Sequence, residues 1–164
     1  MDPLADVLLE DPRWKAAGLE ALSQPAVHAA LTAAGVAPEY EVCVLGCDDA
    51  RIAVLNAEFR GKPAPTNVLS WPAFDLAPDD SGRPPLPPAA GGMEESLGDI
   101  AIAYETCLRE AAEKGIPAAD HITHLIIHGT LHLLGYDHQN DVQANVMEGL
   151  EVKALASMGI KAPY

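Results

Sequence analysis

The stretch HGTLHLLGYDH, residues 128–138, places three histidines within eleven residues of a mostly apolar run. His128 and His132 are four residues apart, so a helix would carry both imidazoles on one face, one turn apart. Gly135 can take the left-handed conformation that ends a helix, and the chain can then bring His138 back toward the same point. Three neutral imidazoles that leave a fourth position open are a catalytic zinc ligand set. The spacing therefore predicts one zinc ion per chain.

The spacing H-x-x-x-H-x-x-G-x-x-H is also that of the metzincin peptidases. Those enzymes carry a glutamate directly after the first histidine, where it serves as the general base. This chain has Gly129 at that position, so the ligand spacing is present without the peptidase base. A metallopeptidase is therefore the weaker alternative.

Two neighbours of this motif have open roles. His124 continues the row of His128 and His132 by one turn, and it is either a ligand in place of His138 or a group that orients a ligand. The glycine turn favours His138 as the third ligand. Asp137 stands beside a ligand and is either a turn residue or a group that orients an imidazole or a water molecule.

Hydrophobic patterns predict the strands and helices that must position these side chains. Strands are expected at about 5–10, 40–47, 67–71 and 97–105, and helices at about 12–34 (one or two, broken at Pro25), 48–59, 106–114, 118–134 and 140–158. Strands alternating with helices predict an α/β fold, with a small mixed, mostly parallel sheet packed against several helices. We expect a single domain over residues 1–164, with the metal site at a helix end and the following turn.

The segment at about 73–95 is rich in proline, glycine and acidic residues. Such a composition predicts a long loop, which is either a surface insertion or a flap over a site.

The N-terminus, the apolar runs and the cysteine count indicate the cellular compartment of the protein. The N-terminus MDPLADVLLEDP lacks the basic start and long apolar run of a signal peptide, and no run reaches the roughly 20 apolar residues that cross a bilayer. We therefore expect a cytoplasmic protein with no membrane partner. Three cysteines in such a chain argue against a disulfide framework.

The net charge of −14, from 24 acidic and 10 basic residues, argues against nucleic acid as a partner. However, Arg51, Arg60 and Lys62 lie in a short segment that contains only one acidic residue, Glu58. Charge near a site matters more than the sum over the chain, so the two observations conflict.

Beyond the histidine motif, three further segments of the chain resemble segments of the YbeY endoribonuclease family, the bacterial rRNA maturation factors. In the expected order they are LNAEFRGKPAPTNVLSWP (55–72), LGDIAIAYE (97–105) and NVMEGLEVKAL (145–155). With HGTLHLLGYDH, which is the most specific of the four, they cover most of the chain from about residue 41. Two features depart from the family: Asn67 stands where many relatives have aspartate, and the segment at 73–95 is longer than usual.

The resemblance implies a zinc-dependent, single-strand-specific endoribonuclease that acts in small-subunit rRNA 3′-end maturation and ribosome quality control. Its partners would be single-stranded RNA, precursor small-subunit rRNA, and the ribosomal small subunit or assembly proteins. By the same resemblance, the metal ligands match His128, His132 and His138, and the arginine tied to activity matches Arg60.

The chemistry of the side chains is consistent with cleavage of a phosphodiester. A guanidinium such as that of Arg60 is planar, permanently charged and able to bind two phosphate oxygens at once. Thr66 and Ser70 are further candidate donors to phosphate. The sequence identifies no general base, because Gly129 cannot serve as one. The nucleophile is either a zinc-bound hydroxide that acts alone or the RNA 2′-OH. The remaining alternative is a non-catalytic ribosome-assembly factor with a structural zinc, which an open three-histidine site disfavours.

Overall fold

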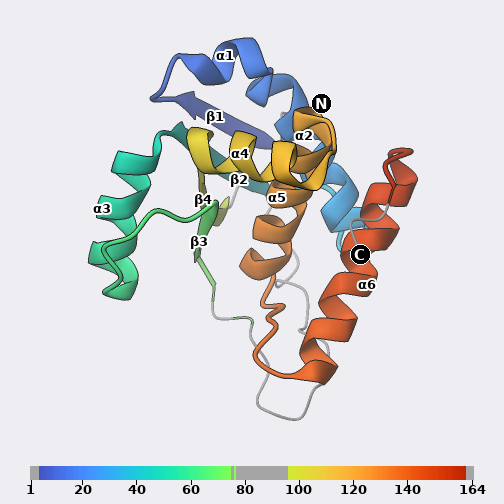
Figure 1. Ribbon diagram of the computed structural model, residues 1–164. Coiled ribbons are helices and arrows are strands. Elements are labelled where there is room, and N and C mark those ends of the chain that lie inside the picture. Colours follow the sequence, from blue (N-terminus) through green and yellow to red (C-terminus); the bar gives the residue numbers. More distant parts are fainter. Residues whose placement is uncertain (1–3, 75, 77–95, 162–164) are drawn as a thin grey trace.

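A four-stranded sheet lies at the centre of the computed structural model, which describes residues 4–74, 76 and 96–161 (Figure 1). The strands lie in the order β1 (Ala5–Leu9), β2 (Glu41–Cys47), β4 (Ser96–Ala103) and β3 (Val68–Pro72). β1, β2 and β4 are parallel, and β3 pairs antiparallel with β4 at the edge. The predicted α/β fold with a mixed, mostly parallel sheet is confirmed.

Six helices surround the sheet in the described part of the chain. They are α1 (Arg13–Ala17), α2 (Leu19–Ala33), α3 (Asp49–Arg60), α4 (Tyr104–Lys114), α5 (Ala118–Leu133) and α6 (Asp141–Ser157). Helices α2, α5 and α6 pack together on one side of the sheet, and α3 lies on the other (Figure 1). Successive residues of β4 point to opposite faces of the sheet. Ile100 belongs to the larger core, and Ala101 belongs to the smaller core under α3.

Helix α5 is the most deeply buried helix and carries most of the histidines. It lies against β3, β4, α2, α4 and α6, and only a few of its residues reach solvent. Its fully buried side chains include Ile122, Ile126, Ile127, Leu131 and Leu133. Burying each such side chain contributes about 1.5–3 kcal/mol, so this helix is a rigid support for polar groups at its end.

The helical segment at 12–34 does form two helices, but the predicted break at Pro25 is wrong. Gly18, with φ of 78°, separates α1 from α2, and Pro25 lies inside α2. A proline inside a helix removes one backbone hydrogen bond and costs about 3 kcal/mol. Burial of Ala26, Val27 and Leu31 on the following turns stabilises the helix against that loss.

The strand predicted to reach residue 105 ends at Ala103, because α4 begins at Tyr104. Two helix N-termini cap each other at this point. Asp49, at the start of α3, accepts hydrogen bonds from the backbone N–H (3.0 Å) and the hydroxyl (2.8 Å) of Thr106. Glu105 in return accepts from the backbone N–H of Asp49 (3.1 Å). Carboxylates at N-termini stabilise helices, so this exchange fixes where α4 starts.

The other predicted strands and helices have bounds within one residue of those expected. The loop expected at about 73–95 lies outside the described residues, except for Ala73, Phe74 and Leu76. Cys43, Cys47 and Cys107 are unpaired. Among the described helices, none is long and apolar enough to cross a membrane.

Candidate metal centre

The turn after α5 returns the chain toward the helix, as the sequence predicts. Gly135 has φ of 103°, and its backbone N–H donates to the carbonyl of His132 (3.0 Å). Tyr136 donates to the carbonyl of Leu131 (3.1 Å), which satisfies the last turn of the helix. The Asp137 carboxylate then accepts the backbone N–H of His138 (2.8 Å). Asp137 is therefore a turn residue, and its role toward a ligand stays a prediction.

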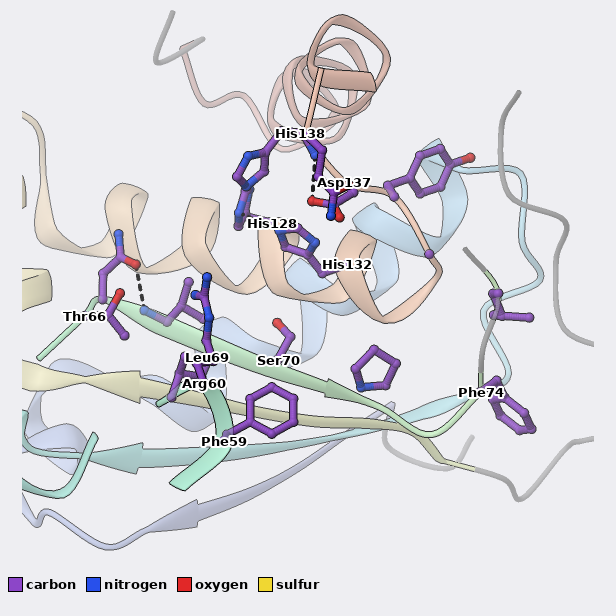
Figure 2. A pocket seen from close by; sticks show the side chains of 17 residues that line it. Phe59, Arg60, Thr66, Leu69, Ser70, Phe74, His128, His132, Asp137 and His138 are labelled. Carbon is purple, nitrogen blue, oxygen red and sulfur yellow. Dashed lines mark hydrogen bonds between the residues drawn. The ribbon is translucent and has the colours of Figure 1, made fainter. Parts of the chain in front are cut away.

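His128, His132 and His138 converge at the end of α5 (Figure 2). One ring nitrogen from each lies within 4.8 Å of the others. The Nε2 atoms of His128 and His132 are 3.1 Å apart. Ligand nitrogens at about 2.0–2.1 Å from a tetrahedral zinc ion stand about 3.4 Å from each other, so this spacing fits a zinc ion with little rearrangement.

The protonation state of His132 also suits a ligand. Burial, together with the neighbouring His128 ring, lowers the pKa of His132 to about 4. The imidazole is therefore neutral at neutral pH and keeps a lone pair for a cation. The three imidazoles, with His132 neutral, fit the expected zinc ion.

A carboxylate that the sequence reasoning missed lies behind the ligands. Glu151 on α6 is 1% exposed, and its Oε2 is 3.1 Å from Nδ1 of His128. Its other oxygen is hydrogen-bonded to Nε2 of His124. Burial by itself raises the pKa of Glu151, but the bonds from His124 and His128 outweigh it and lower the pKa to about 2. Glu151 is therefore ionised and can only accept hydrogen bonds.

The sequence did contain a signal for Glu151. Met147, Glu151, Ala154 and Leu155 form the buried face of α6, with helical spacing. A glutamate among apolar residues on one helix face is almost never buried without a partner. The periodicity of NVMEGLEVKAL therefore pointed to a buried acid, although it could not name the histidines that meet it.

His124 does not join the three converging histidines. Its ring centroid lies 6.5 Å from that of His128, and its Nε2 faces Glu151. The structure thus brings His138, and not His124, to the candidate ligand group.

His121, one turn before His124, has a carboxylate of its own. The ring is 1% exposed, and its Nε2 lies 2.9 Å from Oε1 of Glu110 on α4. Burial lowers the pKa of His121, and the hydrogen bond that the ring donates to Glu110 partly opposes that shift. Glu110 also accepts from the side-chain amide of Asn67 (3.1 Å). An aspartate at position 67 could not donate this bond unless it was protonated.

A cavity of about 590 Å³ opens onto the three histidines. Its lining contains every residue expected at the site apart from His124. The lining residues are Phe59, Arg60, Thr66, Asn67, Val68, Leu69, Ser70, Pro72, Phe74, Leu76, His128, His132, Gly135, Tyr136, Asp137, His138 and Gln139. Among these described residues, Arg60 is the one arginine or lysine. Arg60 is the last residue of α3, and its side chain extends beside β3 on the same side as the histidines (Figure 2).

The glycine that replaces the peptidase glutamate faces the sheet. A Cβ atom at Gly129 would lie 3.0 Å from Cδ1 of Ile100 and 3.2 Å from Oγ of Ser70. The Ser70 hydroxyl donates to the carbonyl of Gly129 (3.4 Å). These contacts are tighter than ordinary packing, so a side chain at this position would have to displace the side chains of Ile100 and Ser70. Ser70, expected as a phosphate donor, already has an acceptor.

A second group with metal-binding side chains occurs in the described residues. Asp6, Glu41 and Cys43 lie on the neighbouring strands β1 and β2. None of them lines the cavity, and carboxylates on an exposed surface commonly stand together without an ion.

Comparisons with known proteins agree with this arrangement. The profile of the family described as Endoribonuclease YbeY matches residues 9–159. Relatives named Endoribonuclease YbeY include one from Dinoroseobacter shibae, 58% identical over 161 residues (97% of this chain and 89% of the relative). Another, from Ruegeria pomeroyi, is 56% identical over 163 residues (97% and 96%).

The fold is also similar to that of a Thermotoga maritima protein solved in solution. The TM-score is 0.57 at 21% identity, over 94% of this chain and 91% of the other. At that identity the likeness supports the fold alone. The family profile, which spans nearly the whole chain, and the close relatives establish that the chain belongs to the YbeY endoribonuclease family.

Proposed function

We propose that this protein is a zinc-dependent endoribonuclease that cuts single-stranded RNA during 3′-end maturation of small-subunit rRNA and in ribosome quality control. Family membership supports an endoribonuclease acting in rRNA processing. The observation that carries the metal-dependent chemistry is the convergence of His128, His132 and His138 on the cavity. Precursor rRNA, the ribosomal small subunit or assembly proteins would be the partners, in the cytoplasm.

His128, His132 and His138 would hold the zinc ion through three neutral ring nitrogens, which leaves a position open toward the cavity. When bound, zinc supplies a Lewis acid that polarises a phosphoryl oxygen and makes water more acidic. The chain itself supplies the fixed ligands and a shaped cavity. Gly129 has no side chain that could take a proton from the nucleophile, so the general base is not at this position of the helix.

Arg60 would bind the phosphate group that is cut. Its guanidinium can donate to two non-bridging oxygens, where negative charge accumulates during phosphoryl transfer. Arg60 lines a cavity that has few negative groups, since Asp137 is the one acidic residue among the described lining residues. Thr66 also lines the cavity, and its hydroxyl could donate a hydrogen bond to a phosphate oxygen of the substrate.

Local charge explains how a chain of net charge −14 could accept RNA. A zinc ion adds two positive charges at the cavity, and Arg60 adds a third. The substrate would therefore meet a positive site on an acidic protein. Single-stranded RNA suits this geometry because its backbone can bend to place one phosphodiester in a cavity, which a stacked duplex resists.

The test is cleavage of a single-stranded RNA that carries the precursor 3′ end, with and without a chelator and after zinc is restored. We expect cleavage to be lost with the chelator and recovered with zinc. Arg60→Glu should lower the rate by about 10²–10³-fold without changing zinc content, as expected for loss of a group that stabilises transition-state charge.

Lys62→Glu is the matched control for Arg60→Glu. Lys62 is exposed, lies two residues away and is not part of the cavity lining, while the charge change is the same. Equal activity of the Arg60→Glu variant and the wild type would remove Arg60 from the mechanism. Cleavage that persists in the chelator would contradict metal dependence.

A further inference from the structure

Glu151 is an acidic side chain placed where an apolar one would be expected. It lies on the buried face of α6 between Met147 and Leu155 and is 1% exposed. A carboxylate buried at such a place loses several kcal/mol of hydration. Pairing with histidines offsets that loss, yet apolar side chains of similar size often stabilise a fold as well as a buried ion pair does. Fold stability alone therefore does not account for Glu151.

The two oxygens of Glu151 meet two imidazoles of α5. Oε2 lies 3.1 Å from Nδ1 of His128, and Oε1 is hydrogen-bonded to Nε2 of His124. A carboxylate is an acceptor, so His128 must carry its proton on Nδ1. Its Nε2 then has the free lone pair, and Nε2 is the atom that lies 3.1 Å from Nε2 of His132. The contact with Glu151 thus selects the ring nitrogen that faces the candidate ligand group.

We propose that Glu151 is a positioning residue that holds His128 in its Nδ1–H form, with Nε2 aimed at the metal, and that His124 holds Glu151. This inference rests on the metal site of the proposed function. It gives His124 the role of orienting a ligand indirectly, through the carboxylate. Partners of this kind fix the orientation of a ligand and increase its basicity, and losing one commonly weakens metal binding by about 10–100-fold.

The first test needs no substitution. ¹⁵N chemical shifts of the His128 ring in the metal-free wild-type chain, recorded above the pH at which the ring is protonated, report which nitrogen carries the proton. We expect the proton on Nδ1. A His128 ring with its proton on Nε2 would overturn the proposal.

The second test compares Glu151→Gln with Glu148→Gln in the full-length protein. A glutamine at 151 has one acceptor oxygen and one donor amide, so it cannot accept from both His124 and His128. We expect zinc affinity, measured by competition with a chromophoric chelator, to fall by about 10–100-fold. The absorption spectrum of bound cobalt should change as well. Glu148 lies on the same helix but outside this network, so Glu148→Gln should match the wild type.

These measurements separate the inference from the proposed function. If Glu151→Gln is folded, binds zinc as tightly as the wild type and gives the same cobalt spectrum, the positioning role is overturned, whether or not RNA is cut. If Glu151→Gln loses zinc affinity while the wild type binds zinc but cuts no RNA, the inference stands and the proposed function does not.

Discussion

The two halves of α5 place the same side chain in two different environments. His121 and His124, in the first half, are buried and meet the carboxylates of Glu110 and Glu151. His132, in the second half, has its ring at a cavity and points toward His138. What lies across from the helix therefore decides whether a histidine is an internal hydrogen-bonding group or a candidate ligand.

His128 belongs to both environments. Its Nδ1 meets a carboxylate, as in the first half of the helix, and its Nε2 joins the converging group, as in the second half. A histidine row with helical spacing is thus divided at His128. The division is set by α4 and α6, which supply glutamates only along the first half and the middle of α5.

The sharpest test of this division compares His132→Ala with His121→Ala. We expect His132→Ala to lose stoichiometric zinc binding and RNA cleavage, because two imidazoles remain where three are needed. His121→Ala should keep its zinc and lose stability, since it opens a cavity and leaves Glu110 without one of its partners. Zinc content by atomic absorption and unfolding midpoints measure both effects.

The fold of His132→Ala carries additional information. A variant that is folded but inactive agrees with a catalytic metal. A variant that unfolds whenever zinc is absent would favour the alternative of an assembly factor with a structural zinc. Zinc loss by His121→Ala equal to that of His132→Ala would break the comparison between the two halves.

The sequence was a good guide wherever spacing along one segment was enough. The α5 helix, the turn at Gly135 and the return of His138 all follow from local pattern, and so do the strands of the mixed sheet. The role of His124 could not be decided this way, because its partner Glu151 is 27 residues away on another helix. Local spacing contains no information on how α6 packs against α5.

The error at Pro25 has the same origin. Its local rule is correct, but the buried neighbours of the proline on α2 contribute more than one missing hydrogen bond removes. The start of α4 likewise depends on Asp49, which lies on another helix, 57 residues before its partner Thr106 in the chain. Tertiary contacts overrode local preference at each of these places.

Packing of the second half of α5 on the sheet can be tested at Gly129. We expect Gly129→Ala to destabilise the protein by about 1 kcal/mol, because overpacking costs about 1–3 kcal/mol against a gain of about 1 kcal/mol in helix propensity. The new Cβ would press on Ile100, which is 1% exposed. Urea unfolding of the chelator-treated protein measures the change.

Gly149→Ala is the control for Gly129→Ala. Gly149 is also helical, and a Cβ atom there meets nothing within 4 Å, so we expect a gain of about 0.5–1 kcal/mol. Zinc content should be normal in both variants. A stabilised Gly129→Ala would show that Ile100 yields easily and that the sheet does not constrain the helix beside His128.

The smallest expected effect lies in the first half of α5 and depends on pH. Burial lowers the pKa of His121 below its ordinary value of 6.5, so the unfolded chain takes up a proton there before the folded chain does. The stability that follows from this difference is complete above pH 6.5 and falls as the pH drops below it. The charged or titratable groups near the ring are Glu110 and Lys114 of α4 and His124 of α5.

We expect His121→Gln to flatten the decline of unfolding free energy below pH 6.5 in the chelator-treated protein, at a loss of about 1 kcal/mol near pH 8 from the altered bond to Glu110. His28→Gln, at an exposed position of α2, is the matched control because it makes the same substitution away from the buried face of α5. An unchanged decline in His121→Gln would mean that the folded and unfolded chains bind the His121 proton equally, so that the bond to Glu110 fully offsets the effect of burial. A decline that becomes steeper in His121→Gln would mean that the glutamate holds a charged ring in the folded state, and the first half of α5 would then differ from the second in charge as well as in exposure.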